Sequence, residues 1–361
     1  MVVNRRGIMK NIGFLVVFGA IALFTSCRKD NTPNPFDPNA PKPTKPVERP
    51  ASINIVGDTA DVTTSTQAGV VIMGGGADVD AALKWMIARS GGGDVVVIRA
   101  TGTDAYNAYI KGLGTVNSVE TLKIDSRKLA DDARVAHIIR NAEMLFIAGG
   151  DQADYVGYWK GTKTMAAINY LLAEKKVPVG GTSAGAAILG NYYFSAERGG
   201  VESADALANP YGQRVSIGRD DLLKAPFLQN VITDQHFTQR DRQGRSAVFL
   251  GRIMKDWNKT PYGIAVDEKT AVCIDANGMA EVLGTNRAFF LKTDGSKKAE
   301  VFEDGKPVTW NNGGKAIEVT AIAGTATNNR FNMTTFEPAS TAGWEKYWWS
   351  VVNGNWSQSA R

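Results

Sequence analysis

The sequence predicts an α/β fold: a mostly parallel sheet with helices on both faces, followed by a β-rich C-terminal part. Short apolar runs alternate with helical stretches between residues 68 and 189, as expected of βαβ units. Several of these runs end in glycine-rich loops. After residue 263 the pattern becomes β-rich and less regular.

The individual elements follow in order along the chain. Apolar runs rich in valine and isoleucine predict buried strands, and longer stretches between them predict helices. We expect strands at residues 68–73, 94–98, 119–124, 144–147 and 177–179, with a further strand at 263–266. We expect helices at residues 78–89, 131–142, 163–175 and 184–189. Ligands of such sheets lie beyond the C-terminal strand ends, so chemistry is expected in loops 74–78, 149–152 and 181–185.

Charge argues against a general nucleic-acid-binding protein. The net charge is +5, of which residues 1–27 contribute +3 and residues 28–50 contribute +2. Residues 51–361 are therefore close to neutral and lack the basic excess that phosphate binding requires.

Cysteine and histidine are scarce. The two cysteines are Cys27 and Cys273, and the two histidines are His137 and His236. So few thiol and imidazole groups argue against a clustered zinc site, and a carboxylate metal site stays open; the serine chemistry described below needs no metal and no cofactor. Cys273 lies in an apolar run, where a small buried side chain is expected.

The N-terminus resembles a bacterial lipoprotein signal peptide over residues 1–27. Basic residues precede an apolar stretch at 14–24, which is short for a membrane span. Small residues then lead directly to Cys27, the expected site of lipidation. The alternative is an ordinary signal peptide that contains a cysteine. We expect an exported protein that is lipid-anchored to the bacterial membrane, on its periplasmic or cell-surface side.

Residues 28–50 are predicted to form a linker before a peptidase domain at 51–361, in which 280–361 is a β-rich extension. The linker contains seven prolines. Proline fixes φ and removes an amide donor, so neither helix nor sheet is expected there. An extended spacer would hold the following domain away from a membrane surface.

Residues 181–185 read Gly-Thr-Ser-Ala-Gly and fit the pattern of a nucleophile elbow. The turn is expected between a strand and a helix, with Ser183 exposed at the helix N-terminus, where amides favour a developing oxyanion. The alternative is a simple strand-to-helix turn in which Ser183 caps the helix.

A nucleophilic serine needs a base, and the base needs an acid that orients it. His236 lies in a segment rich in charged and turn residues, whereas His137 lies within a predicted helix. Asp267 and Glu268 follow the 263–266 strand. Neighbouring strand residues point to opposite faces, so only one of the two is expected to enter the site.

Five ordered blocks resemble the cyanophycinase-like branch of the S51 serine peptidases. They are Met-Gly-Gly-Gly at 73–76, Ala-Gly-Gly-Asp-Gln at 148–152, the elbow at 181–186, Asp-Gln-His-Phe at 234–237 with Arg240, Arg242 and Arg245, and Gly-Ile-Ala-Val-Asp-Glu-Lys-Thr-Ala at 263–271. The resemblance covers roughly residues 68–275 and implies a fold like that of class I glutamine amidotransferases.

The resemblance also implies roles for particular residues. Ser183 would be the nucleophile, His236 the base and Glu268 the orienting acid, with Asp267 in reserve. The amides of Ala184 and Gly150 would hold the oxyanion. The resemblance implies a serine peptidase that hydrolyses the β-aspartyl (isopeptide) linkages of cyanophycin, a polyaspartate with arginines attached to its side chains, with release of β-Asp-Arg. Substrate contacts would come from Gln152, Asp234, Arg242 and Arg245. A homodimer is a further expectation from the family.

Several alternatives stay open at this point. The chain could be a catalytically silent binding lipoprotein on the same scaffold, or an aspartyl dipeptidase-like enzyme. The arginines could belong to a solvated helix face, and Gln152 could merely begin a helix. The insertion at 198–218 could form a lid. The aromatic cluster Trp344, Tyr347, Trp348, Trp349 and Trp356 indicates core packing, or else a surface that binds sugar or peptide.

Overall fold

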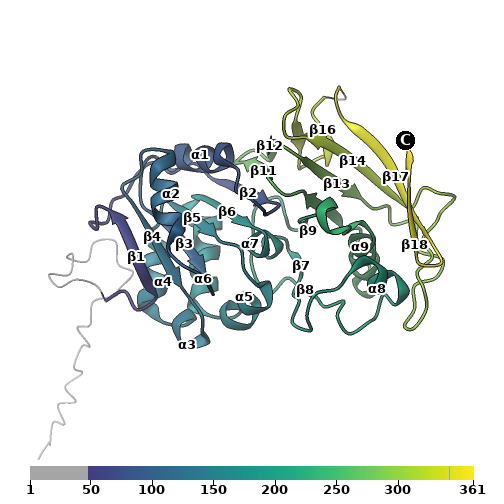
Figure 1. The fold of residues 1–361 in the computed structure, drawn as a ribbon, viewed down its shortest axis with the longest axis horizontal. Helices are drawn as coiled ribbons and strands as arrows, with labels where there is room; N and C mark the ends of the chain where they lie inside the picture. The colour runs from purple at the N-terminus through teal and green to yellow at the C-terminus, as the bar shows by residue number, and fades with distance from the viewer. Residues whose placement is uncertain (1–47, 341) are drawn as a thin grey trace, which may run out of the picture. The chain divides into compact units, whose positions relative to one another are not determined.

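Two β-sheets organise the protein (Figure 1). The computed structural model describes residues 48–340 and 342–361, which belong to one compact unit. The predicted signal peptide with Cys27, and the linker up to residue 47, lie outside the described residues. No helix of the described part has the length and apolar character needed to cross a membrane.

The first sheet contains ten of the described strands, in the spatial order β1-β4-β3-β5-β6-β2-β11-β12-β15-β16. Their bounds are β1 (Ser52–Gly57), β2 (Gly69–Met73), β3 (Val95–Arg99), β4 (Ser118–Lys123), β5 (Met144–Ile147), β6 (Pro178–Thr182), β11 (Thr270–Asp275), β12 (Met279–Gly284), β15 (Arg330–Asn332) and β16 (Glu337–Pro338).

The second sheet contains eight described strands, in the order β18-β17-β14-β13-β10-β9-β7-β8. They are β7 (Tyr192–Phe194), β8 (Ile217–Arg219), β9 (Val231–Gln235), β10 (Tyr262–Val266), β13 (Arg287–Lys292), β14 (Ile317–Ala323), β17 (Glu345–Val352) and β18 (Asn355–Ala360).

The helices are α1 (Asp80–Arg89), α2 (Ala105–Leu113), α3 (Arg127–Ala130), α4 (Ala133–Asn141), α5 (Gln152–Trp159), α6 (Lys163–Tyr170), α7 (Ala184–Ala187), α8 (Ser203–Ala208) and α9 (Gln243–Trp257). A π-helical turn (Leu171–Lys175) extends α6, and a 3₁₀ turn (Thr238–Arg240) precedes α9.

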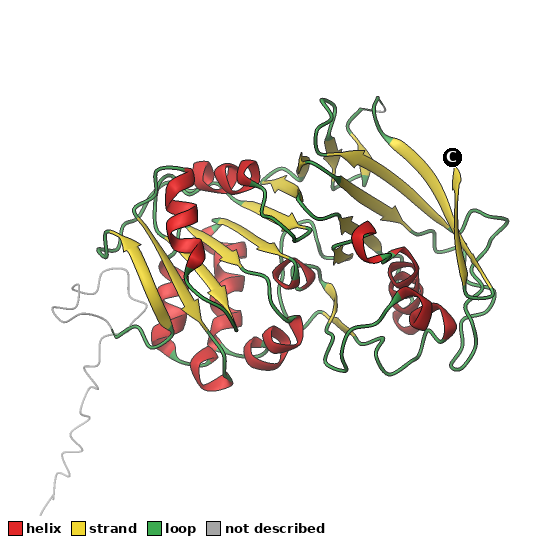
Figure 2. Ribbon diagram, viewed as in Figure 1, coloured by secondary structure: helices red, strands yellow, loops and turns green. Residues whose placement is uncertain are grey.

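Five central strands of the first sheet, β4, β3, β5, β6 and β2, are mutually parallel. Successive side chains of these strands enter different apolar clusters. Val71 and Val97 pack with buried residues of α1 and α2, whereas Ile72 and Ile98 pack with those of α4, α5 and α6. Strands that are buried on both sides require such continuous apolar runs. Helices therefore cover both faces of this parallel region (Figure 2).

The prediction of a mostly parallel sheet holds only for this central region. Strands β1, β11, β12, β15 and β16 pair antiparallel in the first sheet. In the second sheet, the described parallel pairs are β9 with β10 and β9 with β7. The β-rich segment after residue 263 returns mainly through hairpins, and consecutive strands joined by tight turns pair antiparallel.

The second sheet has its own core against α8 and α9. Phe249, Leu291, Val319 and Trp349 are buried together there. Strand β10 lies between β9 on one side and β13 on the other. The C-terminal strands therefore extend the same sheet that contains β9 and β10, whose ends lead into the site described below.

Candidate active site

Ser183 lies in the turn between β6 and α7 and has φ of 51° and ψ of −117°. A non-glycine residue in this conformation stores strain, as the serine of a nucleophile elbow does. The small neighbours are needed sterically. A Cβ on Gly185 would lie 2.2 Å from the carbonyl oxygen of Ile147, and one on Gly181 would lie 2.5 Å from the backbone of Gly185.

A continuous chain of hydrogen bonds joins three side chains. Ser183 Oγ lies 2.7 Å from His236 Nε2. Nδ1 of the same imidazole lies 2.6 Å from Glu268 Oε1. With the proton on Nδ1, His236 donates to Glu268 and can accept the hydroxyl proton of Ser183. The arrangement has the geometry of a nucleophile, a base and an orienting carboxylate.

Neighbouring parallel strands bring His236 and Glu268 together. Gln235 at the end of β9 pairs in register with Val266 at the end of β10. His236 follows the first strand and Glu268 follows the second, so both leave the same edge of the sheet. Parallel strands place their carboxyl ends side by side, which is the usual location of a site.

The glycine loop after β2 connects this edge to the first sheet. Gly74 accepts a hydrogen bond from the His236 amide at 2.7 Å, and Gly75 accepts one from the Lys269 amide at 2.9 Å. A Cβ on Gly75 would lie 2.3 Å from the imidazole ring of His236. Only glycine permits so close an approach at a φ of 90°.

The two acidic candidates have different partners. Glu268 faces His236, whereas Asp267 Oδ1 accepts hydrogen bonds from the amide and the hydroxyl of Thr238, both at 2.8 Å. Asp267 is buried and holds the turn that follows His236. The geometry therefore places Glu268, and not Asp267, against His236.

Burial lowers the pKa of His236 below its ordinary value of 6.5. The hydrogen bond to Glu268 opposes this change, and the nearby positive charges of Arg240 and Arg242 add to it. The balance favours a neutral imidazole, which is the form that accepts a proton.

The amides expected to hold an oxyanion flank the serine. Ala184 is the first residue of α7, where the amide has no carbonyl partner within the helix. The 149–150 loop runs beside the nucleophile, since a Cβ on Gly149 would lie 3.9 Å from Ser183 Oγ. The next residue is Gly150, whose amide belongs to the same loop.

Gln152 is the first residue of α5, directly after this loop. Asp151 caps the helix by accepting a hydrogen bond from the Ala153 amide at 2.9 Å. The Gln152 side chain is half-exposed and makes no hydrogen bond to another described residue. It is therefore available to a ligand at the loop.

Asp234 and Arg245 do not agree with their predicted role as substrate contacts. The Arg245 guanidinium donates to both carboxylate oxygens of Asp234, at 2.5 and 3.0 Å, and Ser246 donates to the same carboxylate at 2.7 Å. Both side chains are buried. Burial alone would raise the pKa of Asp234, but the Arg245 charge holds it below its usual range. The ion pair between Asp234 and Arg245 therefore connects β9 to α9.

Arg242 has an intermediate position. Its guanidinium donates to the carbonyl of Gln235 at 2.7 Å and lies 3.5 Å from Asp234. Burial lowers its pKa to about 10. The charge remains in place at neutral pH and acts on His236, so Arg242 contributes to the electrostatics of the site.

Asp78 is a residue of the site region whose role the sequence did not indicate, although it lies in the 74–78 loop. Its carboxylate accepts a hydrogen bond from Tyr106 at 2.7 Å and lies close to Thr182, the residue before Ser183. Burial raises its pKa. The loop position was the only available signal, because the partner Tyr106 comes from a helix that the sequence pattern did not predict.

Within residues 48–340 and 342–361, no group of three or more His, Cys, Asp or Glu side chains is arranged to hold a metal ion. Cys273 is a free, buried thiol in β11.

Comparison with known proteins shows which protein family the sequence matches. The model described as peptidase family S51 matches residues 99–282, just over half of the chain. A cyanophycinase from Geminocystis herdmanii is 24% identical over 222 residues, which cover 61% of this chain and 70% of that protein. One from Trichormus variabilis is 29% identical over 168 residues, 46% of this chain and 50% of that protein. The match thus spans only about half of the length of the second relative.

A crystal structure of a peptidase from an acI-B1 actinobacterium is 16% identical, covers 63% of this chain and 91% of that chain, and superposes with a TM-score of 0.46. Because the family model covers more than half of the residues, the chain belongs to peptidase family S51 and is a serine-type peptidase.

Proposed function

We propose that the protein hydrolyses a β-aspartyl polymer of the cyanophycin type through Ser183, His236 and Glu268. The observation that carries the proposal is the hydrogen-bond chain from Ser183 Oγ through His236 to Glu268, at 2.7 and 2.6 Å. The cyanophycinases among its relatives support the choice of polymer.

The reaction proceeds by acyl transfer. His236 takes the Ser183 proton as the oxygen attacks the carbonyl carbon, and the amides of Ala184 and Gly150 receive the oxyanion. The protonated His236 then gives its proton to the departing amine, which leaves an acyl ester on Ser183. Water activated by His236 hydrolyses this ester. Glu268 stabilises the imidazolium that forms in each half of the cycle.

The expected product identifies the bond that is cut, which is the amide between aspartyl units and not the β-aspartyl linkage that the sequence resemblance first implied. Release of intact β-Asp-Arg requires cleavage of the amide between successive aspartyl units, because each unit keeps its arginine. Cleavage of the β-linkage itself would release free arginine and leave polyaspartate. A dipeptidase-like enzyme would act on dipeptides and leave the polymer intact.

The test is mass spectrometry of the products from cyanophycin and from β-Asp-Arg dipeptide, using the full chain and Ser183→Ala side by side. We expect β-Asp-Arg from the polymer with the parent protein and none with the variant. Release that survives in Ser183→Ala would remove Ser183 from the mechanism. Absence of release, together with a serine that reacts with fluorophosphonates, would leave a peptidase with another substrate.

The proposal includes export and lipid anchoring at Cys27, supported by the apolar stretch before it and the proline-rich segment after it. A lipid anchor would place the peptidase where it meets polymer outside the cell. Cys27→Ser is expected to move the protein from the membrane fraction to the soluble fraction after cell lysis. Membrane association that persists in this variant would argue against lipidation.

A further inference from the structure

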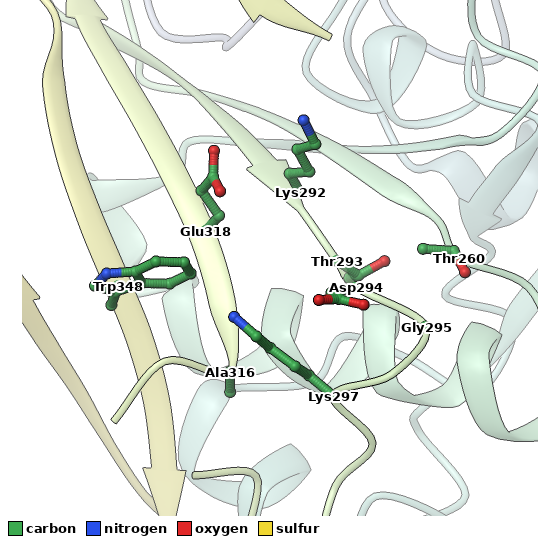
Figure 3. Close-up of a pocket in the computed structure, with 9 residues that line it drawn as sticks. All are labelled: Thr260, Lys292, Thr293, Asp294, Gly295, Lys297, Ala316, Glu318 and Trp348. Atoms are coloured by element: carbon green, nitrogen blue, oxygen red, sulfur yellow. The ribbon is translucent and has the colours of Figure 1, made fainter. Parts of the chain in front are cut away.

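A cavity of about 280 Å³ lies on the second sheet (Figure 3). We call it the Trp348 pocket and define it by Thr260, Lys292, Asp294, Lys297, Glu318 and Trp348. None of the three residues of the hydrogen-bond chain lines it. The size approaches the lower end of the range for small-molecule sites.

One cross-strand row forms the floor of the pocket. Lys292 of β13 pairs in register with Glu318 of β14, which pairs with Trp348 of β17. Neighbouring strands lie about 4.8 Å apart, so these three side chains stand next to one another on one face. Trp349 points to the opposite face, where it is fully buried in the core. Trp348 is therefore the member of the aromatic cluster that faces the cavity.

The lining contains charges of both signs. Lys292 forms an ion pair with Glu337, and Glu318 forms one with Arg361. Lys297 makes no ion pair with any residue in the described part of the chain. Its ammonium instead lies 4.3 Å from the centroid of the Trp348 ring, and Figure 3 shows it reaching into the pocket from its loop.

The ring of Trp348 already attracts cations. Besides Lys297, the guanidinium carbon of Arg361 lies 5.3 Å from the ring centroid. An indole face favours guanidinium in particular, because the planar group can stack on it. A ligand guanidinium could replace the Lys297 ammonium on the Trp348 ring, next to Glu318. The displaced ammonium would then be free to pair with a carboxylate of the ligand.

The pocket and the active site lie at opposite ends of β10. Thr260 precedes the strand and Tyr262 pairs with Lys292, whereas Glu268 follows the other end. The five residues of β10 span about 17 Å at 3.3 Å per residue. An extended polypeptide advances about 3.5 Å per residue, so at least about five units are needed to bridge the two sites.

We infer that the Trp348 pocket is an accessory site for a polymer segment that carries both guanidinium and carboxylate groups. This inference rests on the proposed function, because it takes the same substrate class. Asp294 and Glu318 would repel a purely anionic ligand, and Lys292 and Lys297 would repel a purely cationic ligand. An arginine attached to a polyaspartate chain supplies one guanidinium and one carboxylate, which matches the two signs present.

The test measures binding of oligomers of β-Asp-Arg units by isothermal titration calorimetry, with Ser183→Ala introduced throughout to prevent turnover. Oligomers of roughly ten units are long enough to reach both sites. Lys297→Ala and Glu318→Gln remove one charge each from the pocket. Lys298→Ala removes the neighbouring lysine, which is exposed and outside the pocket, and is the matched control.

We expect each pocket variant to weaken binding of the long oligomer by at least about fivefold, since linked contacts multiply affinity. Lys298→Ala should bind like its parent. Equal affinity in all four proteins would overturn the inference, as would a neutral oligosaccharide that binds the pocket when the oligomer does not. Circular dichroism checks that the variants fold.

Parallel turnover by the protein with Ser183 intact separates the two proposals. Binding that depends on Lys297, without hydrolysis of the polymer, would contradict the proposed function and leave the accessory site standing. Hydrolysis of the polymer with no dependence of binding on Lys297 would support the proposed function and contradict the accessory site.

Discussion

Glu268 accepts a hydrogen bond at 2.6 Å from Nδ1 of His236, although the chain offers another carboxylate one residue earlier. Asp267 is turned away and holds Thr238. The two neighbouring acids therefore have separate partners: Glu268 faces the imidazole of His236, and Asp267 holds the turn that follows it.

Glu268→Gln should lower kcat/KM by about 10³-fold or more, because a neutral amide stabilises neither the required tautomer nor the imidazolium. Steady-state peptidase assays measure the loss, and the thermal midpoint should stay near that of the parent. Asp267→Asn is the control: it should lower stability more than activity. The opposite pattern would assign the orienting role to Asp267.

The acid limb of the pH–rate profile should have its midpoint below pH 6.5. His236 must be neutral to act as a base, and burial lowers its pKa, so activity persists into more acidic solution than an ordinary histidine allows. Arg240→Gln removes one of the charges that lower this pKa and should move the limb to higher pH. The pH dependence of kcat/KM measures this midpoint. A midpoint above pH 6.5 in the parent would contradict a lowered pKa of His236.

Arg245→Ala should reduce the free energy of unfolding by about 3–5 kcal/mol, because it leaves the carboxylate of Asp234 buried without its partner. Urea denaturation measures this change. Arg240→Ala removes an exposed arginine and should change stability by less than about 0.5 kcal/mol. If Arg245 contacted substrate instead, its loss would raise KM and leave stability nearly unchanged.

Gly185→Ala should abolish activity, since its Cβ would meet the Ile147 carbonyl at 2.2 Å and displace the elbow. Gly157→Ala is the matched control within α5, where an added Cβ meets nothing within 4 Å. Removing a glycine from a helix interior should stabilise the protein by about 0.5–1 kcal/mol and leave turnover unchanged. Thermal unfolding and activity are measured on both variants. An active Gly185→Ala would contradict the steric argument.

Much of the parallel region could be predicted from the sequence, because its strands are buried on both faces and read as continuous apolar runs. The 144–147 strand agrees in both bounds with β5. Helix α9 was considered only as a solvated helix face for the arginines, since its buried Arg245 and its glycines obscure an apolar face in the sequence. The pairing of β9 with β10 depends on contacts distant in sequence, which no local pattern contains.

The backbone at the end of β9 separates Asp234 from His236. Residues two apart on a regular strand point to the same side. His236 instead has φ of 48°, which breaks the alternation at the end of β9. Asp234 thus meets α9, while His236 meets Ser183. The sequence contains no direct sign of this positive φ.

Labelling of the protein with a fluorophosphonate, followed by peptide mapping, tests whether His236 activates Ser183. We predict one adduct on Ser183 in the parent and at least about 10³-fold slower labelling in His236→Ala, because the hydroxyl loses its base. Labelling on another serine, or labelling of Ser183 at the same rate without His236, would contradict it.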